Sequence, residues 1–147
     1  MNREELEKYA ISKMKDEGYS CSQSMVITII ECIRNYENIS KEKEQEYLNI
    51  ASGYGGGIAS LGQTCGFISG STIGYSLIIK DDVELLKEKT RMINKLVINF
   101  VGHWQCQKII QQYGKVTQVQ RREKCIEILE YLVKYVYDDI SAMYQNK

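Results

Sequence analysis

Cysteines are the residues in this 147-residue chain whose chemistry could extend beyond packing. There are five, and no two form a C-x2-C pair. Cys21 and Cys65 each follow a residue that can cap a helix, and Cys106 follows a break at Gly102. In a first helical turn, unpaired N–H groups and the helix dipole favour an anion. We therefore expect these three thiols to have lowered pKa values and to form reactive thiolates or metal ligands.

The other two cysteines have different surroundings. Cys32 falls inside an apolar stripe late in its helix, which indicates core packing. Cys125 lies on the core stripe of the last helix, two turns from its start, so only partners from elsewhere in the chain would give it a function. The lone histidine, His103, could act as a base or metal ligand beside Cys106, although histidines at helix ends more often bond a terminal carbonyl.

Glycines are concentrated around Cys65, with eight of the eleven in residues 51–79. A glycine-rich loop before a helix can direct N–H groups at an anion, which resembles a phosphate cradle. The loop lacks a Gly-Lys-Ser/Thr ending and follows a predicted helix instead of a strand, so neither nucleotide fingerprint fits. The candidate cofactor-binding residues are Gly55, Gly56, Gly57 and Gly66.

The elements that position these residues are predicted to be helices. The chain has no proline, and apolar residues recur every three or four positions. We expect a single all-α domain, a bundle of six to seven helices with the glycine-rich loop between the third and the fourth. The expected helices cover about residues 2–17, 21–35, 41–51, 65–80, 81–104, 105–114 and 117–144. Gly66, Gly70 and Gly74 would let another backbone approach the fourth.

Charge and composition limit the classes of function. The chain has 19 basic and 19 acidic residues, so it has no excess charge for nucleic acid. No apolar segment has the length of a signal peptide or a membrane span, so we expect a cytoplasmic protein without membrane insertion. An odd, widely spread set of five cysteines is untypical of a secreted disulfide scaffold.

Three segments carry a resemblance to a known family: "SCSQSMV" around Cys21, "ASGYGGGIASLGQTCGFISGS", and the single cysteines Cys106 and Cys125. Together they resemble the C_GCAxxG_C_C family of redox-active proteins over about residues 17–130. The resemblance implies a functional set of Cys21, Cys65, Cys106 and Cys125, with family glycines at Gly53, Gly55, Gly56, Gly57, Gly62, Gly66 and Gly70. Cys32 and His103 have no counterpart, and Phe67 replaces a small alanine.

Three functions follow from this resemblance and the residues. The first is thiol–disulfide chemistry, with Cys65 attacking and Cys106 or Cys21 resolving the mixed disulfide. The second is an iron–sulfur or other metal site held by the four family cysteines, since a similar segment occurs in cytochromes with an iron–sulfur centre. The third is a non-catalytic interaction module of a transporter, because family members are often encoded near transporter genes. The implied partner is a redox protein or a transporter component, and a homo-oligomer is an open alternative.

Overall fold

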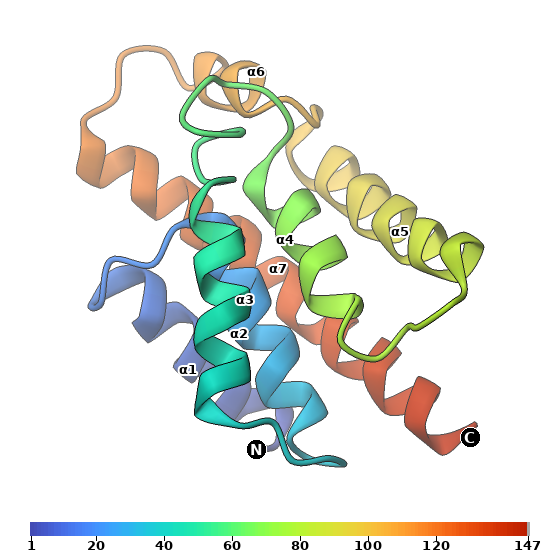
Figure 1. The fold of residues 1–147 in the computed structure, drawn as a ribbon. Coiled ribbons are helices and arrows are strands. Elements are labelled where there is room, and N and C mark those ends of the chain that lie inside the picture. Colours follow the sequence, from blue (N-terminus) through green and yellow to red (C-terminus); the bar gives the residue numbers. More distant parts are fainter. Residues whose placement is uncertain (147) are drawn as a thin grey trace.

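The computed structural model describes residues 1–146 and confirms the all-α prediction (Figure 1). Within these residues there is no strand, and seven helices follow in the order α1 (Arg3–Lys15), α2 (Cys21–Ile33), α3 (Lys41–Ser52), α4 (Gly66–Tyr75), α5 (Val83–Val101), α6 (Cys106–Gln111) and α7 (Gln118–Gln145). None of these helices combines the length and hydropathy needed to cross a membrane.

Helix α2 is the central element of the bundle and contacts α1, α3, α4 and α7. Ten of its thirteen residues are buried, as expected for a helix that is largely apolar on all sides. Ser20 and Gln23 form a capping box that fixes its first residue, Cys21. The start of α2 therefore has a defined position relative to the helices around it.

Helix α4 packs closely against α2 through a stripe of glycines. A Cβ at Gly70 would lie 2.5 Å from the Ser22 carbonyl oxygen, and one at Gly74 would lie 2.6 Å from Ile29 Cδ1. The expectation that these glycines allow a close approach is confirmed. Phe67, the departure from the family pattern, lies in the core.

Helix α4 ends at Tyr75, several residues before the expected position. The N–H groups of residues 76–79 still bond to carbonyls three or four positions back, as a turn and not as further helix. Asp81 then adopts a left-handed φ of 59°, and the Asp82 side chain caps α5 at the Leu85 N–H. This reversal explains why one apolar run, residues 65–80, contains both a helix and a turn.

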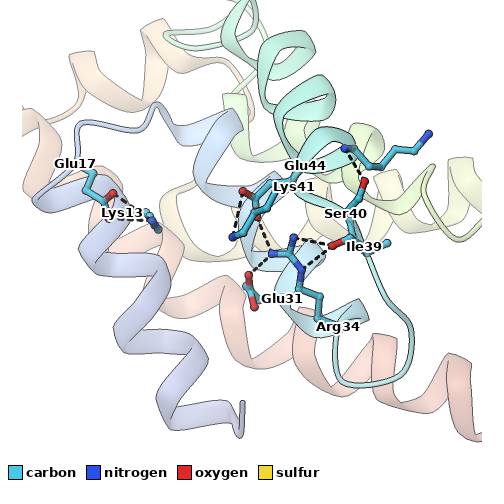
Figure 2. Close-up of polar contacts among 9 residues, drawn as sticks. Lys13, Glu17, Glu31, Arg34, Ile39, Ser40, Lys41 and Glu44 are labelled. Carbon is cyan, nitrogen blue, oxygen red and sulfur yellow. Dashed lines mark hydrogen bonds and ion pairs between the residues drawn. The ribbon is translucent and has the colours of Figure 1, made fainter.

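Two polar clusters hold the bundle together. The Arg34 guanidinium, after α2, donates to Glu31 at 2.5 Å, to Glu44 at 2.7 Å and to the Ile39 carbonyl (Figure 2). On the α7 side, Asp139 accepts hydrogen bonds from the buried Tyr75 hydroxyl at 2.7 Å and from Lys89 at 2.9 Å. The second cluster joins α4, α5 and α7.

Candidate functional site

A two-stranded contact brings Cys65 and Cys106 together although they are 41 positions apart in the sequence. Thr64 and Gln105 form an isolated antiparallel bridge. The Cys65 N–H donates to the Trp104 carbonyl at 2.8 Å, and the Cys106 N–H donates to the Gln63 carbonyl at 2.7 Å. Cys65 lies opposite Trp104, and Cys106 is two residues beyond Trp104 on the same segment. Cys65 and Cys106 are therefore diagonal neighbours on one face of the bridge.

Cys21 reaches the same place from α2. A Cβ on Gly66 would lie 2.3 Å from the Cys21 sulfur, so that sulfur rests directly against the first turn of α4. Cys65 is the residue immediately before this turn. The glycine at position 66 therefore creates the space that places the Cys21 thiol beside Cys65.

The connection between α3 and α4, residues 53–65, passes beside α6 (Figure 1). Five consecutive residues, 56–60, have φ between 49° and 75°, and three of them are not glycine. Gly56, Ala59 and Ser60 of this left-handed run line a pocket. Gly57 packs on Cys106, and a Cβ added at Gly57 would lie 2.7 Å from the Cys106 Cβ.

Helix α7 supplies the opposite wall of the pocket. Cys125 and Arg121, which are four residues apart and so lie on one helical face, both line it. Arg121 Nη2 lies 3.8 Å from Cys106 Sγ. Arg122 Nη1 donates to the Met14 and Tyr19 carbonyls at 2.9 and 3.1 Å, which fixes α7 against the end of α1.

The resulting thiol pocket has a volume of about 470 Å³. Cys21, Cys106 and Cys125 all line it, whereas Cys65 lies behind the surface with 5% of its area exposed. The other residues that line the pocket are Met14, Ser20, Ser52, Gly55, Gly56, Ala59, Ser60, Gln118, Arg121 and Arg122. The structure thus gathers the four family cysteines at one end of the bundle.

The expected lowering of the Cys65 pKa is wrong. Burial raises the pKa of this thiol well above its ordinary value, and repulsion from a Cys21 thiolate raises it further. The Phe67 backbone amide acts in the opposite direction but does not offset burial. A helix N-terminus therefore does not compensate for the loss of water around this sulfur.

The expected lowering of the Cys106 pKa is also wrong, because burial raises the pKa of this thiol. Burial likewise raises the pKa of the Cys125 thiol, to about 12. For both, the next largest cause is the Cys21 thiolate, and Arg121 opposes the shift. Cys21 is thus the neighbour whose charge weighs most on each of the other three family cysteines.

Two other residues singled out from the sequence lie outside the thiol pocket, and two residues that line it were not expected. Cys32 is buried in the core, as its stripe indicated, and His103 does not line the thiol pocket. Arg121 and Arg122 were not anticipated from the sequence. Their signal was present as a basic pair at helical spacing from Cys125, but only the packing of α7 shows which face it covers.

A metal centre is not preformed at this site. Thiolates are good ligands for zinc and for iron–sulfur clusters. However, no group of three or more His, Cys, Asp or Glu side chains within residues 1–146 is arranged to hold a metal ion. As positioned here, the four cysteines do not fit a shared metal.

Comparison with protein families gives a match over residues 19–138 to the family described as "Putative redox-active protein (C_GCAxxG_C_C)". The chain belongs to this family. Neither the curated proteins nor the solved structures gave a match. The C_GCAxxG_C_C assignment supports a redox role at the level of the family, and the four-cysteine arrangement is the part of this structure in which that role could reside.

Proposed function

We propose that this C_GCAxxG_C_C protein carries out thiol–disulfide exchange, with Cys21 as the thiol that meets the substrate and Cys65 as the thiol that resolves it. The observation that carries the proposal is the position of Cys21, which lines the thiol pocket and whose sulfur rests against Gly66, next to Cys65. This order of roles differs from the order expected from the sequence, because Cys65 is buried and its raised pKa disfavours the thiolate.

The exchange conserves atoms and electrons. The Cys21 thiolate attacks one sulfur of a substrate disulfide, a mixed disulfide forms, and the first substrate thiolate leaves. Cys65 then gives up its proton and attacks the Cys21 sulfur, which releases the second substrate thiolate. Two electrons pass from the protein's two cysteines to the substrate; the Cys65 proton goes to one leaving thiolate, and water supplies the proton of the other.

Charge coupling supports this sequence of steps. The Cys21 thiolate is the largest charge contribution that raises the Cys65 pKa. Once Cys21 is held in a mixed disulfide it carries no charge, so this repulsion is absent and the Cys65 pKa falls.

Anaerobic oxidation with diamide followed by peptide mapping tests the proposal. We expect one intramolecular disulfide, Cys21–Cys65, and alkylation of the reduced protein should be fastest at Cys21. Cys21→Ser should abolish this disulfide, whereas Cys32→Ser, a core variant, should keep it. A disulfide that excludes Cys21, or a Cys21 that alkylates no faster than Cys65, would overturn the assignment.

The same preparation separates the other functions. A metal or iron–sulfur protein would contain stoichiometric metal and absorb visible light, and each of the four serine variants would lower the metal content. An interaction module would show no specific disulfide, and serine variants would change only its stability. Either result contradicts the exchange proposal.

A further inference from the structure

The thiol pocket contains two arginines and no acidic residue. Arg121 and Arg122 are both half-buried, and the other eleven lining residues are uncharged or cysteine. Within residues 1–146, neither arginine forms an ion pair with a carboxylate. By contrast, the half-buried cations Arg34 and Lys89 both bind carboxylates. A partly desolvated cation without a counter-ion is unfavourable, so the pocket is suited to an anion.

The two arginines differ in the donors they leave for a ligand. One amino group of Arg122 donates hydrogen bonds to two backbone carbonyls, and these bonds hold the side chain against the wall of the pocket. Arg121 makes a single long contact, with the Cys106 sulfur, and a guanidinium has five N–H donors in a planar fork that matches a carboxylate. Arg121 is therefore the residue equipped to hold an incoming carboxylate beside the thiols.

The dimensions of the pocket select the size of the ligand. A volume of about 470 Å³ lies within the usual range for small-molecule sites, roughly 300–1,000 Å³. The left-handed run of residues 56–60 borders it on one side and α7 on the other. This space is large enough for a small disulfide.

We propose that the substrate is a small disulfide that carries carboxylates, with Arg121 binding a carboxylate and Cys21 facing the S–S bond. This inference rests on the exchange function proposed above and adds the class of substrate. Reduced protein and one disulfide give oxidised protein, with a Cys21–Cys65 bond, and two small thiols. A dithiol reductant returns the protein to its starting state.

Single-turnover kinetics with two probes test the inference. Glutathione disulfide carries carboxylates, and 2-hydroxyethyl disulfide is neutral. Arg121→Gln should slow the anaerobic reaction with glutathione disulfide about tenfold or more, because a charge-assisted hydrogen bond is lost, and leave the reaction with 2-hydroxyethyl disulfide within about twofold. Arg121→Lys should recover part of the rate, and Arg91→Gln, on the exposed face of α5, should change neither reaction.

Binding gives a readout that does not depend on exchange. S-methylglutathione cannot exchange, so its calorimetric titration reports carboxylate binding alone, and we expect affinity that Arg121→Gln weakens about tenfold. Equal slowing of both disulfides would mean that Arg121 acts on Cys106 and would overturn the inference while leaving the exchange function intact. Failure of the wild-type protein to react with either disulfide would instead contradict the exchange function.

Discussion

At the scale of single residues, the surroundings of each sulfur separate the cysteines into three kinds. Cys21 is half-buried and lines the thiol pocket, and Cys65, Cys106 and Cys125 have pKa values raised mainly by burial. Cys32 is 2% exposed in the core, and burial raises its pKa to about 12. One residue type therefore lines a pocket, lies buried behind it and packs in the core of the same chain.

Cys32 gives a prediction about pH. Its thiol stays protonated in the folded chain up to about pH 12, whereas the unfolded chain loses the proton near pH 9.0. Its contribution to stability is complete below pH 9 and falls as the pH rises toward 12, by about 1.4 kcal/mol per pH unit. Urea unfolding between pH 8 and pH 10.5 should show a smaller loss of stability per pH unit for Cys32→Ala than for the wild type. Ile33→Val, a neighbouring core variant that keeps the thiol, should retain the wild-type slope, and equal slopes in all three would refute the assignment.

The sequence predicts the location of the family cysteines better than their chemical state. Ser20 caps α2 as expected, because a cap depends only on neighbours in the chain. The pKa of Cys65 depends on how completely α2, α6 and α7 exclude water from this sulfur. The sequence around Cys65 does not predict that degree of burial. The Thr64–Gln105 bridge is likewise non-local, since it involves one residue pair and no strand.

At the scale of elements, the contact between α2 and α4 sets the geometry of the thiols. Gly70 lies against the Ser22 backbone, one residue beyond Cys21. Any separation of the two helices would also move the Cys21 sulfur away from α4. The glycines of α4 thus serve the site as well as the packing.

Gly70→Ala tests this contact. Alanine favours a helix over glycine by about 1 kcal/mol, yet its Cβ would meet the Ser22 carbonyl oxygen at 2.5 Å and Cα at 2.9 Å. Because both atoms are backbone, the helices must move apart, and we expect a net loss of about 1–3 kcal/mol in urea unfolding. Ser69→Ala, at the adjacent α4 position, should change stability by less than about 1 kcal/mol. A Gly70→Ala protein as stable as the wild type would show that α4 does not constrain α2.

At the scale of the whole molecule, contacts distant in sequence join the two ends of the chain. Arg122 reaches carbonyls more than 100 positions away, and the Tyr75–Asp139–Lys89 cluster links α4 and α5 to α7. Tyr75 is fully buried, so its hydroxyl depends on Asp139. One of these long-range contacts belongs to the thiol pocket, because Arg122 lines it.

Two neighbouring aspartates provide a matched test of this view. Asp139→Ala should lower the free energy of unfolding by about 2–3 kcal/mol, because it leaves the Tyr75 hydroxyl and the Lys89 ammonium without their acceptor. Asp138→Ala removes an exposed ion pair with Arg3 at 3.5 Å and should cost less than about 1 kcal/mol. Chemical denaturation of both variants measures the difference, and equal losses would contradict the role given to Asp139.

The left-handed run of residues 56–60 has a consequence for chirality. Its backbone has φ angles that suit the mirror image of an ordinary amino acid, and a D-residue adopts them without the close contact that an L-side chain makes with its own carbonyl. In a chain assembled by chemical ligation, D-alanine at Gly56 or Ala59 would adopt these φ angles without that contact. One wall of the thiol pocket is thus built with inverted handedness, and mirror-image building blocks could be used to reshape it.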